Sequence, residues 1–307
     1  MTGAGAPEPV AARESATGAI YDLGYRSYDG PRLGRSAAVA TLFWHSLRSA
    51  FAWGKSGRAK IVPWGLSGIT LAPAAVATAI SALVPAGMGA ASPFNYDNYM
   101  SEITVPIALF VAAQAPELVS SDQRNRVLSL YFSHALARTD YALAKLAAMV
   151  LATFILGFAP MLVLYLGNIL VATDVPAAFG DQLENVPQVL FGPLIYALPA
   201  SALALAIAAW TPRRAYATGA IIAVFMVSAA VAGILEEATG GRLADLAPLI
   251  NPFNAADGTR DLLVGDPNPE SSVAGSDLDL WVYGLETLAI TGIAAGAIVF
   301  RYRRVSA

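Results

Sequence analysis

Six stretches of the chain are apolar over enough residues to cross a membrane, and polar segments separate them. We place these spans at about 61–84, 102–121, 146–170, 187–211, 215–235 and 280–300. Each approaches the roughly 20 residues that a helix needs to cross about 30 Å of hydrocarbon. The third and fourth are the clearest, because Leu146–Thr173 and Val186–Pro212 contain no charged residue. The pattern predicts an all-α, polytopic membrane protein with six transmembrane helices within residues 61–307.

The first 60 residues contain no uncharged run long enough to span a bilayer. Residues 1–35 begin with small and polar side chains and have no apolar signal-peptide core, so we expect a flexible cytoplasmic tail. Residues 36–60 contain an amphipathic helical pattern over Ala37–Ser56. A basic amphipathic helix directly before a span is typical of an interfacial helix near anionic headgroups. The alternative is a packed helix of a small soluble domain. The candidate interfacial residues are Phe43, Leu47, Arg48 and Phe51.

The stretch Glu117–Lys145 is a polar, basic interruption between the second and third spans. It is longer than the about two to eight residues that usually connect helices. Its apolar residues recur at helical intervals over Asp122–Leu136, and Ser120–Asp122 can cap a helix there. We predict one short amphipathic helix at a membrane face, exposed to a soluble partner; the alternative is a loop that packs only on its own bundle. The candidate contact residues are Asp122, Arg124, Arg126, Val127, Leu128, Tyr131 and Arg138.

Residues 236–279 form a long connection between the fifth and sixth spans. The first part is too apolar for a free loop, yet it is broken by Pro248, Pro252 and Gly258. Short helices that re-enter the membrane would explain both features, provided that their backbone ends are buried in protein. We therefore expect re-entrant helices in this connection.

The distribution of charge predicts the orientation. If both termini lie on one side, that side holds 17 of the 19 lysines and arginines, and the other side holds only Arg242 and Arg260. By the positive-inside rule both termini are then cytoplasmic, in a cell membrane. Composition agrees with the membrane class, because 56% of the residues are hydrophobic, 13% are charged and mean hydropathy is +0.55. Cysteine is absent, which excludes disulfides and thiol chemistry.

Motifs for enzymatic chemistry fail on inspection. The tripeptide Gly54–Ser56 imitates the end of a phosphate-binding loop, but Ser49 occupies the position of the leading glycine and the context is a continuous helix. His45 and His134 are predicted on the opposite side of the membrane from the acidic pair at 236–237, so no metal centre is expected. The basic clusters flank spans, which explains them without nucleic acid. We predict a catalytically silent chain with no cofactor or metal of its own.

Polar residues within the spans are candidates for a translocation path, because ionisable groups in hydrocarbon usually face a bundle interior or a cavity. Glu117 can instead be an interfacial carboxylate paired with a loop arginine, and Gln114 can make a helix-to-helix hydrogen bond. For Glu102 and Glu286, near the outer boundary, we expect simple solvated positions. The candidate path residues are Gln114, Glu117, Phe225 and Met226.

The loop and its flanks also resemble a known family. Pro116 and Glu117 end one span, and Arg138, Tyr141 and Lys145 open the next one. This arrangement is similar to the loop between the second and third spans of type 2 ATP-binding-cassette (ABC) permeases, the membrane subunits of many ABC exporters. The six-span layout fits the same family across about residues 20–307.

This resemblance implies a permease subunit that forms a translocation path with a second copy or a homologous permease, surrounded by membrane lipids. Two soluble ATPase subunits, which carry Mg-ATP, would dock on a coupling helix in the loop, and re-entrant helices would lie between spans five and six. The alternative function is a secondary active transporter of small amphiphilic molecules, a class that often shows inverted repeats. The sequence names no cargo.

Overall fold

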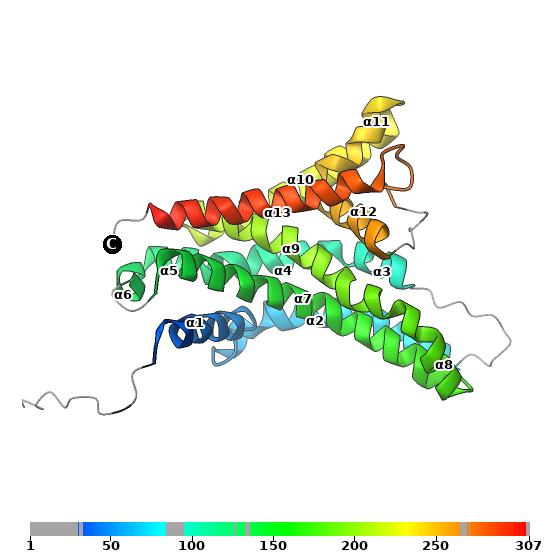
Figure 1. Cartoon of the computed structure of the whole chain (residues 1–307), viewed down its shortest axis with the longest axis horizontal. Helices are drawn as coiled ribbons and strands as arrows, with labels where there is room; N and C mark the ends of the chain where they lie inside the picture. The colour runs from blue at the N-terminus through cyan, green and yellow to red at the C-terminus, as the bar shows by residue number, and fades with distance from the viewer. Residues whose placement is uncertain are drawn as a thin grey trace, which may run out of the picture. The chain divides into compact units, whose positions relative to one another are not determined.

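The computed structural model describes residues 30, 33–83, 95–125, 127–132, 136–264, 269 and 271–304. The chain divides into two units, Met1–Leu33 and Gly34–Ala307, and the predicted tail at 1–35 lies almost wholly outside the described residues. All regular secondary structure in the described part is helical (Figure 1). Six helices are long and apolar enough to cross a membrane. The all-α prediction and the number of candidate spans are confirmed.

The six candidate spans lie close to their predicted positions. They contain α2 (Gly57–Leu83), α4 (Thr104–Leu118), α7 (Arg138–Val171), α9 (Val186–Trp210), α10 (Arg214–Ala238) and α13 (Leu280–Arg303). The largest difference is α7, which begins at Arg138 rather than near 146. Its 34 residues make it about 50 Å long at 1.5 Å per residue, longer than the hydrocarbon layer is thick. The last eight residues of the predicted loop, Arg138–Lys145, are therefore the first turns of α7.

Shorter helices connect or flank the spans. They are α1 (Arg35–Ala50), α3 (Tyr96–Glu102), α5 (Ser120–Arg124), α6 (Leu128–Phe132), α8 (Val175–Gln182), α11 (Arg242–Leu246) and α12 (Pro252–Val264), with 3-10 turns η1 (Leu183–Asn185) and η2 (Ala247–Ile250). In the connection predicted to hold short helices, α11, η2 and α12 follow one another. The helix α12 packs against α9 and α13, and most of its residues are buried.

Helices α7 and α9 form the centre of the bundle. They pack against each other and against α13, while α2 and α1 cover α7, and α4 and α12 cover α9. Small buried residues such as Ala148, Ala152 and Ala204 line these contacts. At Gly157 a Cβ atom would lie 3.1 Å from Met100 and 3.2 Å from Pro193. The abundance of alanine and glycine thus permits close helix packing, as is usual in membrane bundles.

The starts of α2, α7 and α10 and the ends of α4, α9 and α13 gather at one end of this bundle (Figure 1). We call it the basic end, because it carries Lys55, Arg138, Lys145, Arg214 and Arg301. Helices α5 and α6 lie at the same end, and α3, α8, α11 and α12 lie toward the opposite end (Figure 1). The charge asymmetry of the sequence is therefore an asymmetry between the two ends of the folded bundle.

Helix α1 ends earlier than the predicted Ala37–Ser56. The Trp53 N–H donates to the Arg48 carbonyl at 2.9 Å and the Ala52 N–H to the Ser49 carbonyl at 3.0 Å, with φ of 52° at Ala52. These two bonds form a Schellman motif, which stops a helix by placing one residue in the left-handed region. The tripeptide Gly54–Ser56 therefore lies in a turn, and the expectation of a continuous helix there is wrong. Helix α1 itself packs on α7 and α4.

Candidate functional site

The connection between α4 and α7 is the candidate site, because side chains from most of the bundle converge on it. The single helix predicted over Asp122–Leu136 is wrong, since two short helices, α5 and α6, occupy this stretch. Helix α5 follows α4 with an interruption at Val119 and ends at Arg124; the N–H of the next residue, Asn125, donates to the Ser121 carbonyl at 3.0 Å. The separation of α5 from α6 has a physical cause. The polar side chains of α5 bind other helices, while the chain after α5 must reverse direction to reach Arg138.

Asp122 binds two side chains from the start of α7. The Tyr141 hydroxyl donates to Asp122 Oδ2 at 2.7 Å, and Lys145 Nζ lies 2.9 Å from the same oxygen. Lys145 also donates to the Leu118 carbonyl at the end of α4, at 2.8 Å. The Lys145 side chain is 5% exposed and that of Asp122 is 18% exposed. The buried Lys145 ammonium thus has two acceptors, which replace the water molecules that it loses on burial.

Two further residues of α5 reach other helices. Ser120 Oγ donates to the carbonyls of Ala208 at 3.1 Å and Thr211 at 2.9 Å, at the end of α9. The Gln123 amide donates to the Ala209 carbonyl at 2.8 Å and to the Tyr302 hydroxyl at 3.1 Å, at the end of α13. Helix α5 is therefore bonded directly to α7, α9 and α13. The sequence analysis missed Ser120 and Gln123 in this role, although their three-residue spacing places both on one face.

Glu117 connects the remaining spans. Its carboxylate lies 2.6 Å from Lys55 Nζ, before α2, and 2.8 Å from Arg214 Nη1, at the start of α10. Among the described residues these two are its ion-pair partners, whereas Arg124, one of the loop arginines considered, is exposed. The other, Arg126, lies outside the described residues. Lys55, which the sequence analysis excluded as a phosphate ligand, forms this ion pair with Glu117 instead. Through Glu117 and α5 together, all six candidate spans meet at this site.

The predicted contact residues of α6 differ in exposure. Leu128 is 8% exposed and packs in the core, and Tyr131 is half-buried with its ring 5.6 Å from that of Tyr141. Burial raises the pKa of the Tyr131 phenol. Val127 lies in the turn before α6. The exposed large apolar side chain of α6 is Leu130, 63% exposed, which the sequence analysis did not select.

Arg138 and Arg35 make hydrogen bonds at the edge of the site. Arg138 donates to the Arg303 carbonyl at 3.0 Å and lies 5.7 Å from the Phe132 ring. Arg35, at the start of α1, makes a bidentate salt bridge to the Asp140 carboxylate: its Nε and Nη2 atoms each donate to one carboxylate oxygen at 2.6 Å. This hydrogen bond raises the pKa of the Arg35 guanidinium. Helix α1 is thereby attached to the first turn of α7.

The other predicted residues belong to α4, α10 and the α1 region. Gln114 is 5% exposed in α4, and Phe225 is fully buried in α10, where its ring stacks 5.0 Å from Phe253. Met226 is half-buried. In α1, Leu47 is buried, Phe43 is half-buried and Arg48 is exposed, in agreement with the predicted faces; Phe51, in the turn after α1, is half-buried.

A second polar cluster occupies α12. Arg260, expected as an outer cation, has no exposed surface; its Nη2 lies 2.6 Å from Asp261 and its Nη1 3.6 Å from Asp257. Asp257 also accepts hydrogen bonds from the hydroxyls of Ser101, at 2.5 Å, and Tyr196. Glu286, predicted to be solvated, is half-buried, and its Oε2 is buried without a hydrogen-bond partner among the described residues.

Within the described ranges no group of three or more His, Cys, Asp or Glu side chains could hold a metal ion. No protein-family model and no curated protein matches the chain. The candidate site is therefore a polar junction of helix ends, with the exposed apolar residue Leu130 on its surface.

Proposed function

We propose that this chain is the membrane subunit of an ABC exporter, and that α5 and α6 transmit movement from a separate ATPase. The observation that carries the proposal is the convergence of six spans on one short connection. A force applied to α5 would act on the ends of α7, α9 and α13 through Asp122, Ser120 and Gln123. Through Glu117 it would also act on α2 and α10.

The residues that carry the family resemblance also belong to this junction of helix ends. Glu117, Arg138, Tyr141 and Lys145, four of the residues that carry the resemblance, have side chains that bond within it. In this proposal the basic end is cytoplasmic, following the positive-inside rule. Two ATPase subunits carry Mg-ATP beneath it, and a second permease copy or a homologous permease completes the path. The helices α11 and α12, with η2, would be re-entrant elements at the outer face of the cell membrane.

The proposed contact surface differs from the one expected from sequence. Leu128 and Tyr131 pack inside the chain, so they would shape α6 rather than enter a groove on the ATPase. Leu130 is the exposed large apolar residue of α6, and Arg124 is an exposed arginine of α5. A few apolar or arginine side chains usually contribute most of an interface. We therefore assign the docking contact to Leu130 and Arg124. Gln114, Phe225 and Met226 stay proposed path residues that helix movement would have to uncover.

Site-directed crosslinking tests the proposal, because the chain has no cysteine of its own. A photoreactive maleimide on Leu130→Cys should crosslink, in native membranes, to a soluble subunit that contains a phosphate-binding loop and hydrolyses ATP. The matched control is Leu243→Cys on α11, which is also 63% exposed but lies at the opposite end; it should not crosslink to that subunit. Crosslinks from Leu130→Cys to its own chain alone would remove the docking role.

A nucleotide assay separates this function from that of a self-contained ATPase. The purified chain should show no saturable ATP binding, and Lys55→Ala should leave this unchanged, because Lys55 binds Glu117 rather than a phosphate. Saturable ATP binding by the isolated chain would contradict the assignment of ATP to a partner subunit.

A further inference from the structure

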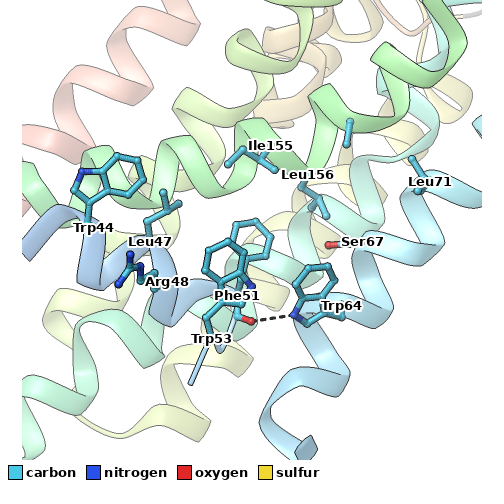
Figure 2. A pocket seen from close by; sticks show the side chains of 11 residues that line it. Trp44, Leu47, Arg48, Phe51, Trp53, Trp64, Ser67, Leu71, Ile155 and Leu156 are labelled. Atoms are coloured by element: carbon cyan, nitrogen blue, oxygen red, sulfur yellow. Dashed lines mark hydrogen bonds between the residues drawn. The ribbon is translucent and has the colours of Figure 1, made fainter. Parts of the chain in front are cut away.

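A groove of about 460 Å³ lies between α1, α2 and α7, away from the junction described above. Figure 2 shows Trp44 and Arg48 on α1, Phe51 and Trp53 in the following turn, Trp64 on α2 and Ile155 on α7 around this space. Its volume is within the about 300–1,000 Å³ of ordinary small-molecule sites. Nearly all of the lining is apolar, so its occupant must be mainly hydrocarbon.

The groove has a structural origin. Helix α1 ends at Ala50, and the chain turns before α2 begins at Gly57, so the two helices separate while both contact α7. The Trp64 indole N–H donates to the Phe51 carbonyl at 3.1 Å and holds the turn against α2 (Figure 2). The space is therefore formed by well-packed elements on three sides and is open on the fourth.

The lining changes character along the groove. Arg48 and the half-exposed indoles of Trp44 and Trp53 lie near one end, and only apolar or small side chains line α2 beyond Trp64, as far as Leu71. Leu71 follows Trp64 by seven positions on α2, about 10 Å along the helix, roughly a third of the hydrocarbon thickness. Tryptophan is typical of the membrane interface. The groove thus leads from headgroup depth into the hydrocarbon, which matches an amphiphile with a polar head and an alkyl chain.

Charge selects the headgroup. Arg48 is exposed and makes no ion pair within the described part of the chain, and no acidic residue lines the groove. Arg58 and Lys60 follow at the start of α2, and both are exposed. A guanidinium binds phosphate oxygens with two parallel hydrogen bonds. A headgroup with net negative charge would neutralise Arg48, the charged residue among those that line the groove, whereas a zwitterionic headgroup would bring its ammonium close to a like charge.

We propose that the groove binds one anionic glycerophospholipid, with its phosphate against Arg48 and one acyl chain between α2 and α7. The lipid would fasten α1 to α2 at the basic end. The inference does not depend on the transport function, since it needs only a membrane and these three helices.

The tryptophans of the groove provide the measurement. The chain has five tryptophans; replacing Trp210 and Trp281 by Phe leaves Trp44, Trp53 and Trp64, all at the groove. This full-length protein is reconstituted in nanodiscs of zwitterionic phosphatidylcholine, and phosphatidylglycerol with brominated chains is titrated in. Bromine quenches indole fluorescence on contact. Quenching should saturate at a low mole fraction, and brominated phosphatidylcholine should need a higher one.

Variants assign the two ends of the lipid. Arg48→Gln should raise the half-saturating fraction of phosphatidylglycerol about fivefold, the effect of one interfacial cation, while Arg48→Lys retains most of the preference. Ala159→Phe, which fills the groove from α7, should abolish saturable quenching by both lipids; Ser67→Leu is a second filling variant if the first misfolds. Arg242→Gln, an exposed cation on α11, is the control and should change nothing.

Three results would overturn the proposal. Equal quenching by the two brominated lipids would remove the selectivity for anionic lipid. A phosphatidylglycerol preference that survives Arg48→Gln would place the headgroup elsewhere. Saturable quenching that persists in both filling variants, with the proteins still monodisperse, would show that the acyl chain does not occupy the groove.

Discussion

Charged side chains join helices in two regions of this protein, and the regions differ in how much water reaches them. At the basic end, the side chains of Glu117, Lys55 and Arg214 are 24%, 34% and 56% exposed. In α12, those of Arg260 and Asp261 are 0% and 1% exposed. Exposed ion pairs contribute about 0–1 kcal/mol and separate easily. A buried pair cannot separate without leaving an unpaired charge in a desolvated site.

The difference suggests a division of mechanical roles. The ion pairs of Glu117 at the basic end can be exchanged for water, so α2 and α10 can shift relative to α4. Arg260 and its two carboxylates lie within α12 itself. Buried hydrogen bonds hold α12 to α9, where the Tyr196 hydroxyl donates to Asp257, and to α13, where the Thr259 and Thr287 hydroxyls are 2.8 Å apart. In the proposed transporter, the basic end would be the part that moves with the ATPase, and α12 would move only together with α9 and α13.

Removing the buried cation should have the largest effect. Arg260→Met leaves Asp257 and Asp261 without their counter-charge, and breaking a buried pair in this way typically costs about 3–5 kcal/mol. We expect a strong loss of monodisperse protein and of thermal stability in detergent, followed by tryptophan fluorescence. Arg242→Met is the control, because Arg242 is exposed and should tolerate the change.

A rescue variant tests the cause of that loss. Asp257→Asn together with Asp261→Asn should restore part of the stability in the Arg260→Met background, because no charge then remains buried. If the triple variant is no more stable than Arg260→Met alone, packing by the arginine side chain, rather than charge balance, stabilises α12.

The next effect concerns the packing that brings α12 against α13. A Cβ atom added at Gly258 would overlap the Tyr283 side chain, with Tyr283 Cβ only 2.6 Å away. Gly258→Ala should therefore separate the two helices and destabilise the fold by about 1–3 kcal/mol, as overpacking usually does. Gly292→Ala in α13 is a matched control, since no atom lies within 4 Å of its added Cβ. Equal melting temperatures for the two variants would contradict the close contact.

Sequence periodicity predicted the spans well because their apolar runs are long and uncharged. It failed where polar residues continue a helix. The turns of α7 from Arg138 to Lys145 contain three charged residues, which hydropathy assigns to a loop. Their charges are neutralised by partners distant in sequence, such as Asp122 and Arg35, and no local pattern contains that information.

The candidate site was predicted in position but not in its contacts. The apolar spacing of Leu128 and Tyr131 indicated a helix, and the same spacing fits packing on the chain's own core, which is what the structure contains. Glu117 was expected to pair with a loop arginine because sequence gives only near neighbours. Its partners, Lys55 and Arg214, come from two other helix starts, and only the folded bundle brings these together.

Lys145 is intermediate between the Glu117 pairs and the α12 cluster, because it is a buried cation whose partner, Asp122, is partly exposed. Lys145→Met removes the ion pair to Asp122 and the hydrogen bond to the Leu118 carbonyl. Asp122 keeps Tyr141 and some water, so we expect a loss of about 2 kcal/mol, typical of hydrogen bonds to charged groups. The control is Lys60→Met at the exposed start of α2. A melting temperature as low as that of Arg260→Met would indicate that the basic end is as rigid as α12.

The smallest effect should also be the one that depends on salt. Glu117→Gln weakens the links to Lys55 and Arg214, and we expect a loss of about 1 kcal/mol or less at low ionic strength. At about 1 M salt the Debye length falls to roughly 3 Å, so exposed pairs are screened and the variant should approach wild type. Arg260→Met should show the same deficit at both salt concentrations, because its cluster is closed to ions.

Glu237→Gln is the matched control for Glu117→Gln, since Glu237 is exposed on α10 at the opposite end. The measurement is thermal unfolding of all three variants at low and high salt. If the deficit of Glu117→Gln is unchanged by salt, water and ions do not reach its ion pairs. The basic end would then be held as firmly as α12, and movement transmitted through Glu117 would require breaking a desolvated contact rather than exchanging one with water.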